Sequence, residues 1–308
     1  MSTIDRRNFI INSAIAAAGL AILPKLAKGM GFEMLPDISV ASGTDAFNNT
    51  LAVVEQLGGI TKFIPKGSKV GLLINAPGHW KNPGSYVQTD IVLAVLKLLN
   101  EAGITDITYL SEPSSVFYSR STKSPDFQNI IDKVKKCSGQ FREIEIPKGV
   151  VLKKAFVIEE MFTCDKIINI PIIKHHAGTL MTGCLKNFMG ACKRETNQSF
   201  HEGPNKTNSE GDVQHLSQCV ADVNLVRKAD LYVADAMLVL KTNGPFGPGE
   251  LLTPNKVFAG TNPVILDAYG STLLGYRPDD IQMLQMAQKL GLGNPDLTKA
   301  TIKEKNLS

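Results

Sequence analysis

Apolar and polar positions along the chain follow two periods, one typical of buried strands and one typical of amphipathic helices. Lys69 to Asn75 is a nearly continuous apolar run, as expected for a strand that is buried on both faces. Thr89 to Ala102 carries its apolar residues on one helical stripe, and Gly103 follows where a glycine commonly ends a helix. Asp106 to Leu110 is apolar again. This order predicts two parallel strands joined by a crossover helix.

The same alternation continues along the rest of the chain. Ser124 and Pro125 open a second helix, and Val150 to Phe162 fits either a pair of strands or a strand followed by a helical turn. The pattern predicts an α/β fold with a mostly parallel sheet flanked by helices. Such a fold can divide into two lobes, with the boundary near residue 165 and a cleft between the lobes. The other predicted strands are Arg142 to Ile146, Lys166 to Ile173, Leu231 to Asp235 and Val257 to Gly260, and the other predicted helices are Val213 to Val226, Pro263 to Leu274 and Asp279 to Leu290.

The N-terminal residues form a pattern typical of an export signal. Arg6 and Arg7 precede an apolar, alanine-rich run from Ile10 to Leu23, and small residues follow at Ala27 and Gly29. Paired arginines before a short apolar segment indicate the twin-arginine route, whose export machinery would be a partner of this chain. The run is shorter than the ~20 residues that span a bilayer, so we expect a signal rather than a membrane span.

A signal of this kind divides the chain into four parts. We expect the signal at 1–29, a linker at 30–44, one α/β domain at 45–295 and a tail at 296–308. The protein is then expected in the periplasm or otherwise outside the cytoplasm, and a signal that stays uncleaved would act as an N-terminal anchor. After the signal, we expect no membrane span, because no later apolar run is long enough.

Charge and cysteine content narrow the functional classes. The formal net charge is +4, most of which lies in the predicted signal, so the remainder carries a charge of about +1 and we expect no nucleic-acid partner. The five cysteines include no CxxC spacing and no run typical of ferredoxin clusters. Cys184 and Cys192 are more typical of buried small hydrophobic residues than of metal ligands.

The stretch from Ile167 to His201 gathers three of the five histidines and several lysines. Its apolar strand ends in Lys174, His175 and His176, and a turn of small residues follows. We predict a short helix from roughly Met181 to Cys192, and then a polar loop that leads to His201. Because ligands of open α/β sheets bind at the carboxyl ends of the strands, this pattern predicts a small-molecule site here.

Individual side chains of this stretch suggest roles in that site. Adjacent residues of a strand point to opposite faces, so at most one of His175 and His176 is expected to line the site, and we favour His176. Lys186 lies in an otherwise apolar segment, either buried in the site or exposed at its rim. We predict His176 and Lys186 as catalytic residues. The N–H groups at the start of the helix, beside Thr182 and Lys186, would suit a phosphate or a carboxylate.

Other segments are expected to reach the same edge of the sheet. Asn75 to His79 follows the first strand, and Thr242 to Gly249 is a loop rich in glycine and proline whose backbone a ligand could approach closely. Asp235 and Asp267 are candidate acids, although Asp267 equally fits a helix residue that binds a nearby loop. The residues predicted to bind a ligand or cofactor are Thr182, Gly183, Lys186, Asn187, Asn243 and Gly244.

The central stretch resembles the domain-of-unknown-function 362 family. Pro171 to His176, Thr182 to Asn187 and Gly190 are similar to that family's central signature, and the resemblance covers most of residues 69–293. Many relatives carry ferredoxin-like cysteines, which this chain lacks, so we expect no iron–sulfur cluster. The other matching positions are Asp235, Asn243 to Pro245, Gly247, Ala259 to Ala268 and Gly275.

A fainter resemblance is to the nickel-pincer lactate racemases, in which a histidine, a lysine and a second histidine follow at similar intervals. The resemblance implies that His176 moves protons, Lys186 tethers the cofactor and His201 binds metal, with His176 as a further candidate ligand. The chain departs from that family between Asn75 and His79, where an aspartate and an arginine are missing, and between Ser111 and Ser115, where a histidine is missing.

These observations favour an exported enzyme of the redox or isomerase type that depends on a cofactor. The cofactor is unknown, and a metal or a metal-containing group fits the residues of the central stretch. The alternative is an exported binding protein that holds a small anionic ligand or a metal without chemistry.

Overall fold

The computed structural model describes residues 35–77, 82–203 and 210–307, and the residues from Pro36 onward form one compact unit. The predicted signal, with Arg6 and Arg7, lies outside the described residues, as do Gly78 and His79. The fold is α/β, as predicted, and is built on a seven-stranded sheet with the order β13-β1-β12-β9-β6-β2-β3. The lobe boundary near residue 165 stays a prediction.

The main sheet is mixed but mostly parallel, which confirms the predicted fold class. Neighbouring strands are parallel from β3 through β2 and β6 to β9, whereas β12 is antiparallel to both β9 and β1. At the far edge β13 pairs in parallel with β1. The strands are β1 (Ile38–Ser42), β2 (Val70–Ile74), β3 (Ile107–Ser111), β6 (Lys166–Ile170), β9 (Leu231–Ala236), β12 (Lys256–Gly260) and β13 (Ile302–Asn306).

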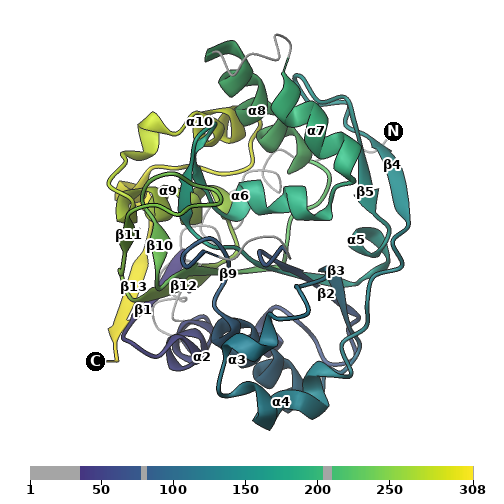
Figure 1. Cartoon of the computed structure of the whole chain (residues 1–308), viewed down its shortest axis with the longest axis vertical. Coiled ribbons are helices and arrows are strands. Elements are labelled where there is room, and N and C mark those ends of the chain that lie inside the picture. Colours follow the sequence, from purple (N-terminus) through teal and green to yellow (C-terminus); the bar gives the residue numbers. More distant parts are fainter. Residues whose placement is uncertain (1–34, 78–81, 204–209, 308) are drawn as a thin grey trace, which may run out of the picture. The chain divides into compact units, whose positions relative to one another are not determined.

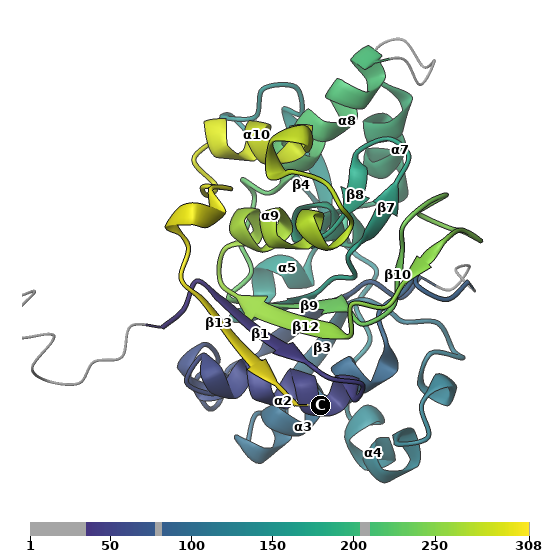
Figure 2. The same cartoon turned by 90° about the vertical axis from the view of Figure 1, so that its left-hand side faces the viewer.

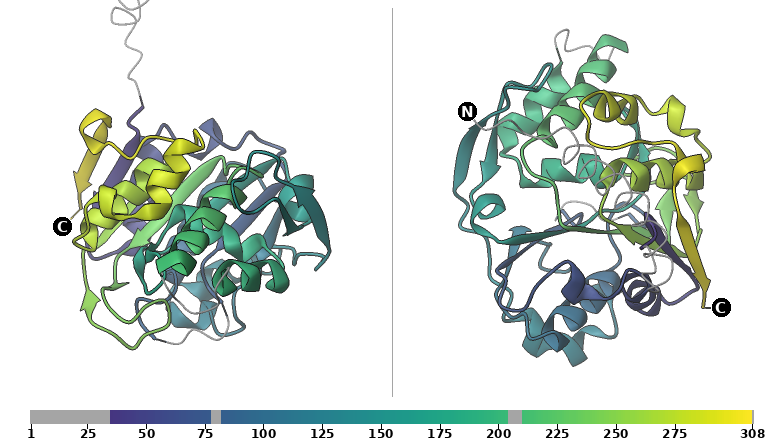
Figure 3. Two further views of the ribbon diagram at one scale, coloured as in Figure 1. Left: turned by 90° about the horizontal axis from the view of Figure 1, so that it is seen from above. Right: turned by 180° about the vertical axis from the view of Figure 1, so that it is seen from behind.

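Helices cover both faces of this sheet (Figure 1). One face carries α2 (Ala46–Gln56), α3 (Thr89–Glu101) and α4 (Ser124–Ile131). Helices from the second half of the chain lie over the opposite face, as the view from above shows (Figure 3). They are α6 (Cys184–Asn187), α7 (Arg194–Glu202), α8 (Glu210–Val223), α9 (Pro263–Leu273) and α10 (Gln282–Lys289). Asn262 caps α9, its side chain accepting the N–H of Val264.

The sheet separates two apolar cores. Leu72 faces the core under α2 and α3, and its neighbour Leu73 faces the core under α6 to α9. Ile168 and Ile167 divide in the same way. Successive side chains of a strand point to opposite faces, so a strand covered on both sides needs apolar residues throughout. That requirement explains why these strands could be recognised in the sequence.

Three small two-stranded sheets lie outside the main sheet. Residues 142–146 were expected as a strand, and β4 (Phe141–Glu145) does form there, but it pairs only with β5 (Lys154–Ile158). A helical turn, α5 (Glu160–Thr163), follows β5, so the segment at 150–162 is a strand and a helical turn. The other two pairs are β7 (Lys174–His176) with β8 (Leu180–Thr182), and β10 (Val239–Leu240) with β11 (Leu251–Leu252).

Two segments predicted as irregular belong to the main sheet. The linker expected at 30–44 contains β1, and the tail expected at 296–308 contains β13, which lie side by side (Figure 2). Every residue of β13 is exposed and three of its five residues are charged. Its sequence therefore lacks apolar alternation, and main-chain pairing with β1 holds it in place.

The predicted helix from Met181 to Cys192 was placed too early in the sequence, and the segment does not form one continuous helix. Met181 belongs to β8, α6 has only four residues, and a 3-10 turn from Phe188 to Ala191 completes the segment. Gly183 and Gly190 flank the short helix, and glycine disfavours a longer one. The polar loop expected before His201 is also wrong, because α7 occupies it.

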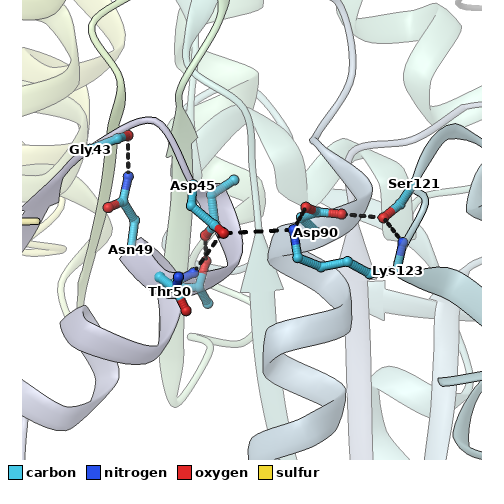
Figure 4. Close-up of polar contacts among 9 residues, drawn as sticks. Gly43, Asp45, Asn49, Thr50, Asp90, Ser121 and Lys123 are labelled. Carbon is cyan, nitrogen blue, oxygen red and sulfur yellow. Dashed lines mark hydrogen bonds and ion pairs between the residues drawn. The ribbon is translucent and has the colours of Figure 1, made fainter. Parts of the chain in front are cut away.

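A polar network joins α2, α3 and α4 near the ends at which they begin (Figure 4). Lys123, just before α4, places its Nζ 2.9 Å from Asp90 in α3 and 3.7 Å from Asp45 at the start of α2. The Ser121 hydroxyl also donates to Asp90. The hydrogen bond to Asp90 raises the pKa of Lys123. The network therefore joins α2, α3 and α4 to one another.

Candidate functional site

A cavity of about 1040 Å³ lies at the carboxyl ends of β2 and β3. Asn75 follows β2 and Ser111 ends β3, and both line the cavity with residues of α6, α7 and α8. This volume is at the upper end of the range for small-molecule sites. Its polar lining includes His176, Thr182, Lys186, Asn187, Arg194, Asn197 and His201, and its apolar lining includes Met189, Leu216, Pro245 and Phe246.

The two adjacent histidines of β7 have different surroundings. His176 is 6 % exposed and lines the cavity, whereas His175 does not line it. The Nδ1 atom of His175 accepts the backbone N–H of Gly244 at 3.0 Å, and so fastens the 242–249 loop to β7. Strand geometry therefore gives one histidine to the cleft and the other to the loop.

Backbone contacts fix where His176 carries its proton. Its Nδ1 accepts the N–H of Gly178 at 3.0 Å, and a backbone N–H can only donate. The neutral ring must therefore carry its hydrogen on Nε2. Burial lowers the pKa of His176 far below its ordinary value, and the positive charge of Lys186 lowers it further. His176 is a neutral hydrogen-bond donor at physiological pH.

His201 carries its proton on the other nitrogen. It lies on α7, where its Nδ1 is 2.8 Å from the backbone oxygen of Asn197, and that oxygen can only accept. Nδ1 is thus protonated and the lone pair of Nε2 is available. The centroid of the His201 ring is 6.2 Å from that of His176. Burial, and then the charge of Lys186, lower the pKa of His201, which favours the neutral base.

Lys186 is a buried amine without a counter-ion among the described residues. It is 8 % exposed, and among the described residues its Nζ donates only to the Met189 sulfur at 3.3 Å, which is a weak acceptor. Burial lowers the pKa of Lys186 to about 8. Lys174, also buried, donates to the backbone oxygen of Ser85, and the charge of Lys186 lowers its pKa further. Lys174 does not line the cavity, so Lys186 is the buried lysine that faces it.

The start of α6 does not offer free N–H groups to a ligand, contrary to the sequence-based expectation. The carboxylate of Asp267 accepts the N–H of Cys184 at 2.6 Å and that of Leu185 at 2.9 Å. A Cβ on Gly183 would lie 2.2 Å from Asp267 Oδ1, so the glycine makes room for this carboxylate. Gly183 is absent from the cavity lining, and its contact with a cofactor stays a prediction.

The two candidate acids both have structural partners. Asp267 holds α6, which is the alternative that its sequence position suggested. Asp235 accepts the N–H of Gln88 at 2.7 Å and that of Met237 at 2.8 Å. Burial raises the pKa of Asp235 to about 7 and that of Asp267 to about 6. Neither carboxyl lines the cavity.

A chain of three amides lies under the cavity. Asn75 Nδ2 donates to Asn187 Oδ1 at 2.7 Å, and Asn187 Nδ2 donates to Asn169 Oδ1 at 2.6 Å. Asn169 Nδ2 donates in turn to the backbone oxygen of Cys184 at 3.1 Å. Sequence analysis did not identify Asn169, which lies inside an apolar strand. A polar residue within a buried strand is a signal that could have identified it.

The 242–249 loop reaches the cavity through residues other than those predicted. Pro245 and Phe246 line it, whereas Asn243 and Gly244 do not. Asn243 Nδ2 donates to the backbone oxygen of Pro248, and a Cβ on Gly244 would lie 1.9 Å from the His175 oxygen. Asn243 and Gly244 therefore shape the loop. Thr182 does line the cavity, and its buried hydroxyl has no partner among the described residues.

Helix α7 contributes residues that sequence analysis missed. Arg194, Asn197 and Gln198 line the cavity together with His201. Their spacing places them on one face of a helix, which is a recognisable signal once a helix is assigned there. Arg194 is exposed and has no carboxylate partner among the described residues. It adds a positive charge to the rim above Lys186.

The arrangement fits a metal ion only in part. Among the described residues there is no group of three or more His, Cys, Asp or Glu side chains that could hold a metal. His201 Nε2 has a free lone pair, but His176 Nε2 carries hydrogen as long as Gly178 donates to Nδ1. The predicted pair of histidine ligands therefore does not fit, whereas a single contact from His201 does.

A family model matches most of the chain, and the comparisons with known proteins leave the function open. Residues 70–272 match the family described as "Domain of unknown function (DUF362)". The thylakoid-associated protein sll1697 of Synechocystis sp. is 22% identical over 255 residues, which cover 81% of this chain and 76% of that protein. The apoprotein structure of lactate racemase from Thermoanaerobacterium thermosaccharolyticum is similar with a TM-score of 0.39 and 12% identity, over 72% of this chain and about half, 53%, of that one.

Proposed function

The chain belongs to the DUF362 family. We propose that this member is an enzyme that binds a small organic anion in the cleft and transfers a proton from and to that anion. The observation that carries the proposal is the pair of rings at 6.2 Å, with a hydrogen on Nε2 of His176 and a lone pair on Nε2 of His201. Lys186 lies beside both and supplies positive charge. These features favour an isomerase-type reaction.

The roles follow from the protonation states. His201 is a neutral base whose Nε2 can take a proton from a ligand held in the cleft. His176, neutral and buried, can polarise a ligand oxygen through its Nε2–H without carrying a full charge. Lys186 stabilises negative charge that develops on that oxygen, and it does so strongly because the site is shielded from water. Proton transfer of this kind needs both rings in their present tautomers.

A second candidate function is binding without catalysis. Lys186 and Arg194 both line the cavity, and neither has a carboxylate partner among the described residues. Glu202 and Asp212 also line the cavity, so Lys186 is the buried cation that can retain an anion there, whether or not a reaction follows. The two candidates differ in what they require of His201, which a binding protein does not need as a base.

Cofactor dependence and export complete the proposal. A metal-containing cofactor would contact His201 Nε2 and the Lys186 amine, and when bound it would supply Lewis-acid or redox chemistry. We also propose that the chain is exported through the twin-arginine route, which rests on Arg6, Arg7 and the apolar run after them. Within the part of the chain that the structure describes, no helix is long and apolar enough to cross a membrane.

The test is hydrogen exchange on candidate ligands. The full chain is incubated in deuterium oxide with a panel of small carboxylates that carry a C–H beside a carbonyl or hydroxyl carbon, and deuterium uptake is followed by NMR. We expect uptake that His201→Gln abolishes and His176→Gln lowers by about 10²-fold or more. His215→Gln, outside the cleft, is the matched control. Binding that persists without any exchange would favour the second candidate.

A further inference from the structure

The polarity of the three-amide chain is fixed at its middle member, Asn187, and at its last member, Asn169, by backbone oxygens that can only accept. Asn187 Nδ2 donates to the backbone oxygen of Leu73 at 3.3 Å as well as to Asn169. Turning the Asn187 amide around would place its oxygen against that carbonyl. Asn169 is fixed in the same way by the oxygen of Cys184. Asn187 Oδ1 must therefore face Asn75, and Asn75 must donate to it.

With this polarity, the side-chain oxygen of Asn75 accepts no hydrogen bond from the described residues. Its Nδ2 is used by Asn187, and its Oδ1 is buried with no hydrogen-bond partner among the described residues. Asn75 is 8 % exposed and lines the cavity. Buried polar atoms are nearly always paired, so an orphan of this kind at a cavity indicates a ligand contact.

A second asparagine that lines the cavity also has a side-chain oxygen without a hydrogen-bond partner among the described residues. Asn197 Nδ2 donates to the backbone oxygens of Met189 at 2.9 Å and Cys192 at 3.3 Å, which leaves its Oδ1 buried and without a partner among the described residues. The cavity thus combines positive charge from Lys186 with amide oxygens that need a donor. An anion made only of acceptor oxygens satisfies the charge and leaves the amide oxygens unpaired.

We propose that Asn75 makes the cleft selective for anions that carry a hydrogen-bond donor, such as a hydrogen-bearing phosphate or a phosphate monoester in its protonated form, over anions that carry only acceptors. Asn187 and Asn169 are positioning residues that hold the Asn75 oxygen in this orientation. The proposal deepens the proposed function, because it rests on anion binding beside Lys186 and specifies which anions bind.

The physical reason is the cost of an unpaired buried acceptor. A ligand O–H directed at Asn75 Oδ1 forms a hydrogen bond in a shielded site, whereas a ligand oxygen without hydrogen brings two lone pairs together. A site built to accept a hydrogen bond rejects an analogue that lacks the donor far more strongly than it rejects one of altered size. Phosphate and sulfate have nearly the same shape, and only phosphate carries a hydrogen near neutral pH.

The test compares these two probes by isothermal titration calorimetry on the full chain near pH 7.5, where inorganic phosphate is mostly the hydrogen-bearing dianion. We expect phosphate to bind at least about tenfold more tightly than sulfate. In Asn75→Leu and Asn75→Ala the ratio of the two affinities should fall below about threefold, chiefly because phosphate weakens. Asn100→Leu, at an exposed asparagine of α3, should keep the parent ratio.

Each outcome decides the proposal. Two Asn75 variants are used so that a folded one is available, as checked by thermal unfolding. Similar affinities for phosphate and sulfate in the parent protein would overturn the selectivity and leave the anion site standing. A ratio that survives in a folded Asn75 variant would remove Asn75 from the account. Failure of both anions to bind would overturn the anion site itself, and the selectivity with it.

Discussion

The rings of His176 and His201 lie 6.2 Å apart between centroids, and backbone contacts force them into opposite tautomers. Gly178 donates to Nδ1 of His176, and Nδ1 of His201 donates to the Asn197 oxygen. One Nε2 therefore donates into the cleft and the other accepts from it.

The tautomers can be measured directly. In nitrogen-15 NMR of histidine-labelled protein, we expect His176 as the Nε2–H form and His201 as the Nδ1–H form. His176 should stay neutral well below pH 6.5, because burial and the nearby charge of Lys186 lower its pKa. A His176 signal that titrates at or above its ordinary pKa, or that reports Nδ1–H, would contradict the proposed acid–base pair.

Two glycines that flank α6 should respond differently to the same substitution. In Gly183→Ala the new Cβ would overlap Asp267 Oδ1 and break the two hydrogen bonds that hold α6, so we expect a loss of about 2 kcal/mol or more in the free energy of unfolding. In Gly190→Ala the nearest atom is Leu73 Cδ1 at 3.3 Å, a side-chain methyl that can shift. We expect a change below about 1 kcal/mol there.

Chemical denaturation at constant pH measures both variants. Equal stability losses in Gly183→Ala and Gly190→Ala would mean that Asp267 does not hold α6 as the contacts indicate. The comparison also separates the structural role of Gly183 from the ligand contact that its sequence position suggested.

Asp235 should make the protein less stable as the pH rises from about 4 to about 7. Burial raises its pKa to about 7 in the folded protein, against ~3.9 in the unfolded chain. Between these values the folded state holds a proton that the unfolded state has lost. The contribution of Asp235 is therefore fully present below the unfolded pKa and disappears as the pH passes the folded pKa, with a slope of up to ~1.4 kcal/mol per pH unit.

The measurement is the free energy of unfolding against pH for the parent and for Asp235→Asn. The variant should be less stable at low pH and should show a shallower slope over this window. Asp267, whose pKa is raised to about 6, contributes in the same direction and leaves part of the slope in place. An identical slope in parent and variant would show that Asp235 is ionised in the folded protein.

The export proposal gives a prediction for Arg6 and Arg7. Replacing both with lysine keeps the charge of the segment but removes the paired arginines that the twin-arginine machinery recognises. We expect the protein to accumulate in the cytoplasm, whereas Lys25→Arg should leave export unchanged. The measurement is cell fractionation followed by detection of the mature chain. Export that continues without the arginine pair would remove this route from the account.

The fold could be predicted where burial leaves a mark on the sequence. Thr89 to Ala102 was predicted as a helix and Thr89–Glu101 forms one, because its apolar stripe packs against the sheet. The edge strand β13 could not be predicted, since its exposed, charged residues are held by main-chain hydrogen bonds. The helix start at Cys184 could not be assigned either, because the decisive partner, Asp267, lies 83 residues away in sequence.

The site could be predicted in outline. His176, which was favoured over His175, lines the cavity whereas His175 does not, and His176, Lys186 and His201 line one cavity. Their catalytic and metal-binding roles stay predictions. Asn169 lies beneath the cavity in a strand that was read as apolar, and Arg194 lies in a segment that was predicted as a loop, so neither was identified.

The buried charge of Lys186 is proposed to hold an anion in the cleft, and both the catalytic and the binding function depend on it. The most direct measurement is calorimetric titration of the parent, Lys186→Met, Lys186→Arg and the control Lys241→Met, at a half-exposed lysine paired with Glu250, with inorganic phosphate. We expect Lys186→Arg, which keeps the charge, to lose ~1–2 kcal/mol of binding, and Lys186→Met, which removes it, to lose about a hundredfold or more in affinity. Affinity in the parent should fall as the pH rises past about 8, the lowered pKa of Lys186. Phosphate binding that is unchanged in a folded Lys186→Met protein would contradict the claim.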